Sequence, residues 1–249
     1  MAFHDGIPGI EETVSSFLLV GQSNMAGRGH LNEVPPIENP NCYMLRMGRW
    51  QPMSEPINMD RSLFGNGARS GIGLSASFAD RYARTYGRKT GLIPCADGGT
   101  TAEQWLPGGV LFDHAVFQAR LAMRSSHLQA ILWHQGESDC TTDADFDAYP
   151  EKFLCILRAL RRELGEDLPI VIGEISAQVD PQIWKTADRA PRFNQRLPKL
   201  AKELGNCAVA SSAGLPLQDG IHFTAAAYRT FGIRYFEALQ TLLSHGADD

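Results

Sequence analysis

The chain has 249 residues, of which 43% are hydrophobic and 20% are charged, and its formal net charge is −5. This composition is typical of a globular protein in water, and the length suffices to bury about three quarters of the unfolded surface without a metal or disulfide. The acidic balance and the lack of a basic tract argue against a nucleic-acid partner.

The first twelve residues have no basic start, no long apolar stretch and no cleavage site of small residues, so we expect neither a signal peptide nor a membrane anchor. A cytoplasmic location is then the default expectation. Secretion is the alternative if a leader once preceded Met1.

Short apolar runs alternate along the chain with longer stretches whose apolar residues recur every three or four positions. The short runs are continuous, which is typical of strands buried on both faces of a parallel sheet. This alternation predicts an α/β fold, a three-layer α/β/α sandwich with a mostly parallel sheet, in one domain over residues 1–249 with its core at about 16–243. The expected strands are Ser16–Val20, Cys42–Leu45, Leu92–Ala96, Ala130–His134, Pro169–Glu174 and Cys207–Ser211. The expected helices are Leu74–Tyr86, Val110–Ser125, Phe146–Leu164 and one capped by Thr224 that ends near Leu243.

Two segments show little periodicity and are expected to be irregular loops. They are Gly48–Ser70 and Ala177–Arg196. Long irregular loops in a compact domain often have functional roles, so both are candidates for shaping a substrate cleft. Surface insertions without a role are the alternative interpretation.

A serine follows the first expected strand by two residues. Gly21 lets the chain turn sharply, which would place the Ser23 hydroxyl at the carboxyl edge of the sheet, near free backbone N–H groups. A serine at this point is also a common helix N-cap. The pattern is not the G-x-S-x-G nucleophile elbow, because position 25 is Met, so a nucleophilic Ser23 requires another serine-hydrolase architecture.

Asp219 and His222 lie three residues apart, a spacing that brings both side chains to one face of a turn. The carboxylate would then hold one ring nitrogen and leave the other free to accept the Ser23 proton. A capping Asp beside a surface His is the alternative interpretation of this pair.

Acyl transfer also needs donors that stabilise an oxyanion. Gly73 can offer an unobstructed backbone N–H, and the Gln135 amide follows an expected strand, so both are candidates. Taken singly, each also fits a structural role, as a packing glycine and a solvated glutamine.

His134, Glu137 and Asp139 have potential metal-ligand chemistry, but their spacing is not H-E-x-x-H and no second His cluster accompanies them. We therefore expect no metal and no cofactor. Trp133 and Trp105 are interpreted as packing residues, with a sugar-stacking platform as the alternative for Trp105.

Five segments carry a resemblance to a known family, and they span about residues 16 to 236. They read FLLVGQSNMAGRG, GIGLSASFA, IPCADGGTTAEQWLPG, AILWHQGESD and DGIHFTAAAYRTFG. In this order they resemble the sialate O-acetylesterase domain and the acetylxylan esterases of carbohydrate esterase family six, within the SGNH (GDSL-type) hydrolase superfamily. The resemblance implies the flavodoxin-like fold of that superfamily.

The resemblance also implies roles for individual residues. Ser23 matches the nucleophile, and Asp219 and His222 match the acid and the base. Gly73 matches the glycine whose N–H joins that of Ser23 in the oxyanion hole, although an alignment shifted by two residues would select Gly71 instead.

Two further matches come from the fourth segment. Gln135 stands where this branch carries glutamine and the wider superfamily usually carries asparagine in the oxyanion hole. Glu137 matches a residue that holds the site together behind the catalytic groups.

These features together predict a serine carboxylesterase that hydrolyses O-acetyl esters on a small carbohydrate, either of the acetylxylan or of the sialic-acid type. The alternatives are a short-chain or aryl esterase without sugar preference and a non-catalytic carbohydrate-binding domain. The expected partner is a small acetylated saccharide, with no nucleic acid and no membrane.

Overall fold

A computed structural model of the chain describes residues 14–58, 69–180 and 188–245. Its centre is a seven-stranded sheet in the order β3-β2-β4-β1-β5-β6-β7. Neighbouring strands are parallel throughout except for β3, which is antiparallel to β2. The strands are β1 (Val14–Gly21), β2 (Cys42–Arg46), β3 (Arg49–Pro52), β4 (Lys89–Pro94), β5 (His127–His134), β6 (Ile170–Gly173) and β7 (Cys207–Ala210).

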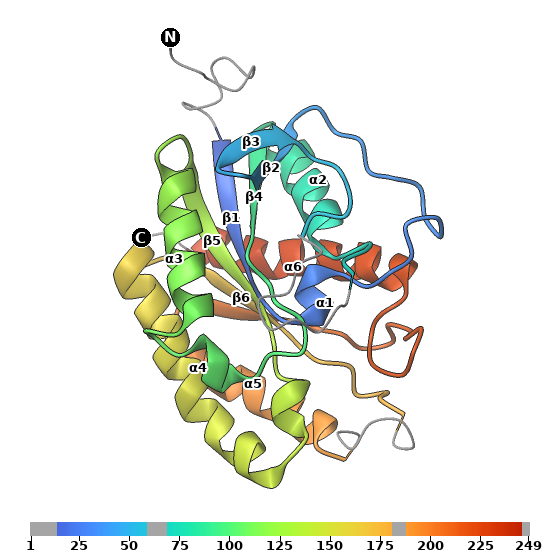
Figure 1. Cartoon of the computed structure of the whole chain (residues 1–249), viewed down its shortest axis with the longest axis vertical. Helices are drawn as coiled ribbons and strands as arrows, with labels where there is room; N and C mark the ends of the chain where they lie inside the picture. Colours follow the sequence, from blue (N-terminus) through green and yellow to red (C-terminus); the bar gives the residue numbers. More distant parts are fainter. Residues whose placement is uncertain (1–13, 59–68, 181–187, 246–249) are drawn as a thin grey trace.

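Helices cover both faces of this sheet, as Figure 1 shows, with α6 passing behind the central strands and α3 nearer to the viewer. Side chains of α3, α4 and α5 pack into one hydrophobic core, and those of α2 and α6 pack into a second. The helices are α1 (Ser23–Ala26), α2 (Ser75–Tyr86), α3 (Val110–Met123), α4 (Asp143–Leu164), α5 (Ala190–Leu204) and α6 (Ala225–His245), with 3-10 turns at Ala102–Trp105 and Ser138–Cys140. The predicted three-layer α/β/α sandwich is confirmed.

The residues of β1 show why its sequence is apolar without alternation. Leu18 and Val20 point into the first core, while Phe17 and Leu19 point into the second. Both faces of the strand are therefore buried, as expected for a central strand of a parallel sheet.

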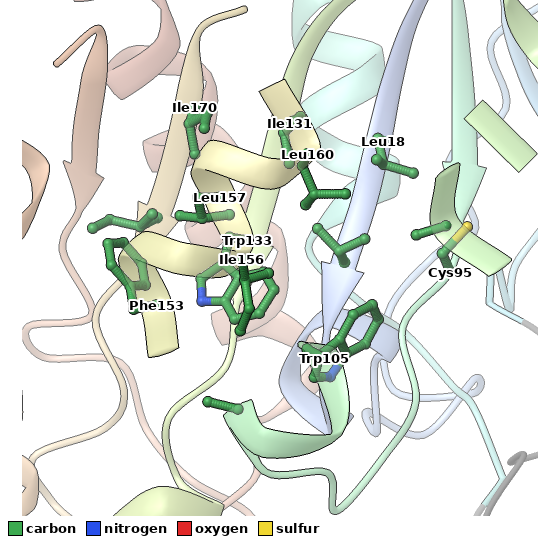
Figure 2. Close-up of a cluster of buried hydrophobic side chains, with 14 of the residues drawn as sticks. Leu18, Cys95, Trp105, Ile131, Trp133, Phe153, Ile156, Leu157, Leu160 and Ile170 are labelled. Atoms are coloured by element: carbon green, nitrogen blue, oxygen red, sulfur yellow. The ribbon is translucent and has the colours of Figure 1, made fainter. Parts of the chain in front are cut away.

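The first core contains both Trp105 and Trp133. Trp105 and Trp133 pack edge to face with ring centroids 5.7 Å apart, next to Phe153 of α4 (Figure 2). Trp105 is fully buried, and its indole N–H donates to Thr100 Oγ1 over 3.0 Å. The packing interpretation is confirmed, and a buried ring cannot serve as a sugar-stacking platform.

The expectation that Gly48–Ser70 is irregular is wrong at its start. Residues Arg49–Pro52 form β3, which adds an antiparallel strand at the edge of the sheet. Only Trp50 is buried within this four-residue strand, so the sequence has too little apolar pattern to reveal it. Residues 59–68 of the expected loop lie outside the described residues.

The second expected loop, Ala177–Arg196, is also partly wrong, because α5 begins within it at Ala190. Pro191 stands in the first turn of the helix, where a missing N–H costs nothing. Residues 181–187, which include Trp184, lie outside the described residues.

The parallel strands β1, β5, β6 and β7 end at a common edge of the sheet. Open α/β sheets place their ligand sites beyond this carboxyl edge. No helix within 14–58, 69–180 or 188–245 has an apolar stretch of the length needed to cross a lipid bilayer.

Candidate active site

The paired ends of β1 and β5 determine where Ser23 lies. Gly21 is aligned with His134, and a Cβ on Gly21 would lie only 2.0 Å from the His134 carbonyl oxygen. Gly21 also has a φ of +132°, which side chains other than glycine rarely tolerate. The chain then turns into α1, with Gln22 N–H donating to His134 O over 2.9 Å, and Ser23 follows directly.

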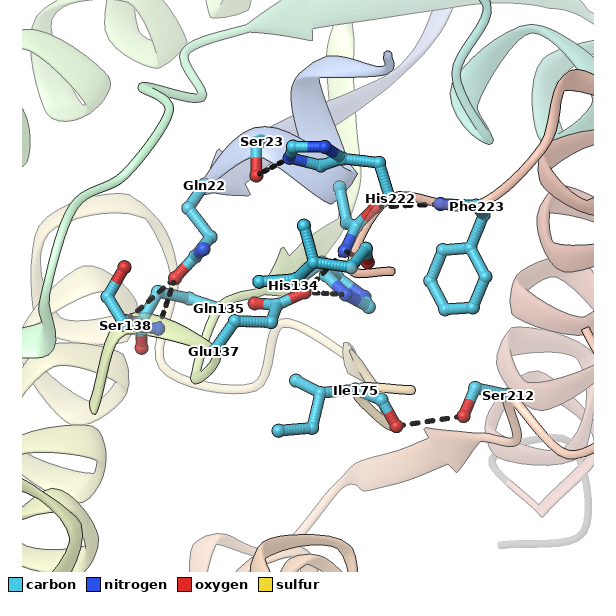
Figure 3. Close-up of polar contacts among 12 residues, drawn as sticks. Gln22, Ser23, His134, Gln135, Glu137, Ser138, Ile175, Ser212, His222 and Phe223 are labelled. Atoms are coloured by element: carbon cyan, nitrogen blue, oxygen red, sulfur yellow. Dashed lines mark hydrogen bonds and ion pairs between the residues drawn. The ribbon is translucent and has the colours of Figure 1, made fainter. Parts of the chain in front are cut away.

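Three of the predicted site residues are joined in one hydrogen-bonded series. His222 Nε2 lies 2.9 Å from Ser23 Oγ (Figure 3). His222 Nδ1 lies 2.6 Å from Asp219 Oδ2. Because an ionised carboxylate can only accept, Nδ1 carries the proton and Nε2 is left to accept from the Ser23 hydroxyl. An imidazole held in this way can take the proton of Ser23 as its oxygen attacks a carbonyl carbon.

Asp219 also shapes the turn that carries His222. Its Oδ1 accepts from the backbone N–H groups of Ile221 (3.2 Å) and His222 (2.8 Å). Partial burial raises the pKa of Asp219, but the hydrogen bonds from His222 outweigh this and keep the pKa below its ordinary value. One carboxylate therefore both caps the turn and holds the imidazole ring, although the sequence alone left these two roles as alternatives.

The helix-cap alternative for Ser23 is not supported. The N-cap of α1 is Gln22, and the Ser23 hydroxyl contacts His222 rather than the backbone of its helix.

The backbone near Ser23 distinguishes Gly73 from Gly71. The N–H of Gly71 donates to the Gly27 carbonyl over 3.1 Å and is therefore occupied. The N–H groups of Ser23 and Gly73 have no acceptor within the part of the chain that the structure describes. Gly73, rather than Gly71, is the glycine that can offer an N–H to a ligand.

Gln135 has different partners from those expected of an oxyanion donor. Its Nε2 donates to Thr100 O (3.1 Å), to Gln22 Oε1 (3.3 Å) and, over a shorter distance, to Asp139 Oδ2. Burial raises the pKa of Asp139 to about 6, which hydrogen bonds from Gln135 and the Ala102 N–H only partly oppose. The structure thus places Gln135 beside Gln22 and not in hydrogen-bond contact with Ser23 or His222.

Glu137 is almost fully buried and contacts Asn24, the residue after Ser23. Its Oε1 accepts from Asn24 Nδ2 over 2.6 Å and lies 3.2 Å from His134 Nε2. Burial raises the pKa of Glu137, but the interactions with His134 and Asn24 outweigh it and hold the pKa below its ordinary value. Asn24 was missed from the sequence, although its place directly after Ser23 was the available signal.

The residues considered for metal binding are divided between two sets of contacts. Glu137 contacts His134 and Asn24, whereas Asp139 contacts Gln135 and Ala102. Across the described residues, no three His, Cys, Asp or Glu side chains are grouped as metal ligands.

Residues 13–241 match the family described as carbohydrate esterase, sialic acid-specific acetylesterase. The chain belongs to this esterase family. It is also 30% identical over 243 residues to a probable carbohydrate esterase of Arabidopsis thaliana, covering 89% of this chain and 88% of the relative.

Solved structures agree with the fold of this esterase family. A protein from Arabidopsis thaliana has a TM-score of 0.78 at 26% identity, covering 93% of this chain and 98% of that one. NanS has a TM-score of 0.73 at 17% identity, and the match covers 94% of this chain and 98% of that one. A carbohydrate acetylesterase from Xanthomonas citri has a TM-score of 0.60 at 16% identity, covering 92% of this chain and 56% of that one. The family resemblance stated from the sequence is confirmed, and the chain is a carbohydrate esterase.

Proposed function

We propose that this carbohydrate esterase hydrolyses O-acetyl esters on a small saccharide through an acetyl-enzyme formed on Ser23. The observation that carries the proposal is the hydrogen-bonded series from Ser23 Oγ through His222 to Asp219. Membership in the esterase family supports a substrate that is an ester of a carbohydrate. The similar structure from Xanthomonas citri is that of a carbohydrate acetylesterase.

In the first half-reaction, Ser23 Oγ attacks the acetyl carbonyl carbon and His222 Nε2 takes the hydroxyl proton. The Asp219 carboxylate stabilises the imidazolium that forms. As the tetrahedral intermediate collapses, the bond between the acetyl carbon and the sugar oxygen breaks. His222 returns its proton to that oxygen, so the sugar leaves as a free alcohol.

The negative charge of the tetrahedral intermediate needs donors that are already in place. The N–H groups of Ser23 and Gly73 are proposed for this role, because neither has an acceptor among the described residues. Gln135 is proposed as the third donor. In this role, one proton of its amide leaves its acceptor in the protein, Gln22 Oε1 or Thr100 O, and binds the oxyanion instead. Each donor contributes about 3 kcal/mol to transition-state stabilisation.

In the second half-reaction, His222 takes a proton from water as the water oxygen attacks the acetyl carbon on Ser23. A second tetrahedral intermediate forms and uses the same donors. Its collapse breaks the bond to Ser23 Oγ, which regains the proton from His222. Acetic acid leaves and releases its proton to water, which gives acetate.

The test is acetate release from a panel of p-nitrophenyl acetate, acetylated xylan and O-acetylated sialic acid, with wild type and Ser23→Ala compared. The proposal predicts release from at least one acetylated saccharide and its loss in Ser23→Ala. Release from p-nitrophenyl acetate alone would favour a short-chain esterase without sugar preference. Glycan binding without release, and with Ser23 unreactive to a serine-directed phosphonate, would favour a non-catalytic binding domain.

A further inference from the structure

Asn24 connects the short helix α1, which carries the proposed nucleophile, to the loop that carries the proposed base. Its Nδ2 donates to the Ile221 carbonyl over 3.2 Å, and its Oδ1 accepts from the Phe223 N–H over 3.4 Å. These are the residues on either side of His222. One side chain, adjacent to Ser23, therefore binds the backbone both before and after the imidazole that contacts Ser23.

The orientation of the Asn24 amide is determined by two further contacts. Nδ2 also donates to Glu137 Oε1 over 2.6 Å, and Oδ1 also accepts from the Tyr228 hydroxyl over 2.5 Å. Both protons and both lone pairs of the amide are thus used. A rotated amide would place its oxygen against the Glu137 carboxylate, which would repel it.

Glu137 is itself held from β5 and α6. His134 contacts it through Nε2 (3.2 Å) and contacts the Tyr235 hydroxyl through Nδ1 (2.9 Å). Asn24, Glu137, His134 and Tyr235 are almost completely buried, so water does not compete for these hydrogen bonds.

Asp219 cannot supply the same connection. Its described contacts are with Ile221 and His222 of its own turn, so it orients the ring without connecting the turn to α1.

We propose that Asn24, oriented by Glu137, is a positioning residue that sets the distance between Ser23 Oγ and His222 Nε2. This inference rests on the proposed function, because it assigns to Asn24 the alignment of the groups that carry the reaction. Asn24 touches neither substrate nor reacting atoms, and its effect is exerted through the 221–223 backbone. Removal of the Asn24 amide therefore leaves Ser23 and His222 in the protein but no longer aligned with each other.

The test compares Asn24→Ala with a matched variant, Asn194→Ala. Asn194 makes the same kind of two-sided contact, with Nδ2 donating to Ile175 O (2.7 Å) and Oδ1 accepting from Ile175 N–H (3.0 Å). Both variants lose an amide that holds a backbone segment, but only Asn24 holds the residues around His222. Thermal unfolding, kcat, KM and the rate of Ser23 labelling by a serine-directed phosphonate are measured for each.

We expect Asn24→Ala to lower kcat roughly a hundredfold, with KM changed less than about threefold, because a misplaced base affects the chemical step. Phosphonate labelling of Ser23 should slow in proportion. Asn194→Ala, which removes two hydrogen bonds of a half-buried side chain, should lose some thermal stability and keep kcat within about twofold of wild type. The inference is overturned if Asn24→Ala loses no more kcat than Asn194→Ala, or if its labelling rate is that of wild type.

If Asn24→Ala does not fold, Glu137→Gln carries the test, since it keeps the shape of the side chain and weakens the hold on Asn24. It should lower kcat about tenfold at unchanged KM, and an unchanged kcat overturns the inference. Ser23→Ala separates the two proposals. Wild-type turnover in Ser23→Ala removes the proposed function, whereas an inactive Ser23→Ala beside a fully active Asn24→Ala removes only the role of Asn24.

Discussion

Gly27 and Gly73 face each other backbone to backbone, at the point where α1 ends against the loop before α2. A Cβ on Gly27 would lie 2.7 Å from Gly73 Cα and 2.8 Å from Gly73 N. Since Ser23 begins α1, this contact holds the Gly73 N–H in a fixed relation to the serine. The two glycines thereby join the segment that carries the proposed nucleophile to the segment that carries the proposed second oxyanion donor.

Alanine substitutions at these glycines should differ in their effects. Gly27 has a φ of +89° in addition to the close contact, so Gly27→Ala should lower the free energy of unfolding by about 2 kcal/mol or more. A Cβ on Gly73 would meet Gly27 Cα at 3.2 Å, which a small shift can relieve, so Gly73→Ala should cost less stability but lower kcat about tenfold. Urea unfolding and steady-state kinetics check both effects. Equal stability losses, or a fully active Gly73→Ala, would count against this assignment.

Gln135→Ala should lower kcat about a hundredfold with little change in KM, since an oxyanion donor acts mainly in the transition state. Steady-state kinetics with an acetylated saccharide provide the measurement. The Gln135 amide also contacts Gln22 and Asp139, so thermal unfolding of the variant is the necessary control. A kcat within twofold of wild type would remove Gln135 from the set of donors.

Asp219→Asn should lower kcat by about ten thousandfold, because an amide at this position no longer holds the His222 tautomer that leaves Nε2 free to accept. Asp219 is partly exposed, so the variant should remain folded. Circular dichroism and kinetics on the same sample check the two statements. A loss of less than about tenfold would show that His222 does not depend on this carboxylate.

Asp139 should give the stability a pH dependence of its own. Burial raises the pKa of Asp139 in the folded protein to about 6, so folding favours the protonated carboxyl group. The stabilisation that comes from this proton is fully present below the pKa that Asp139 has in the unfolded chain. It is lost as the pH rises through about 6. Asp139→Asn removes this titration. The free energy of unfolding of the variant, relative to wild type, should therefore increase by about 1 kcal/mol between pH 5 and pH 7.5. Urea titrations at the two pH values measure the difference, and a constant or decreasing value would contradict the raised pKa.

Most of the fold could be predicted from the sequence because burial on both faces leaves continuous apolar runs. The strand Ser16–Val20 was expected and extends to Val14–Gly21, and the Asp219–His222 spacing was enough to place a carboxylate against an imidazole. Each of these features depends on residues that are close together in the chain.

The features that were missed depend on contacts between distant segments. The strand β3 exists because its backbone pairs with β2, although Trp50 is its only buried residue. Asn24 contacts Ile221 and Phe223, almost two hundred positions later in the chain, only because the fold brings these segments together. No local pattern predicts such a contact.

The measurement that tests the central claim most directly is the detection of an acetyl group on Ser23 during turnover. With p-nitrophenyl acetate, an activated ester, acylation is fast and the acetyl-enzyme should accumulate. The reaction is quenched with acid within its first turnovers, and the peptides are analysed by mass spectrometry. We predict that the peptide containing Ser23 gains one acetyl group, and that Ser23→Ala gains none and releases no acetate. An acetyl group on another residue, or acetate release with Ser23 unmodified throughout, would contradict the account.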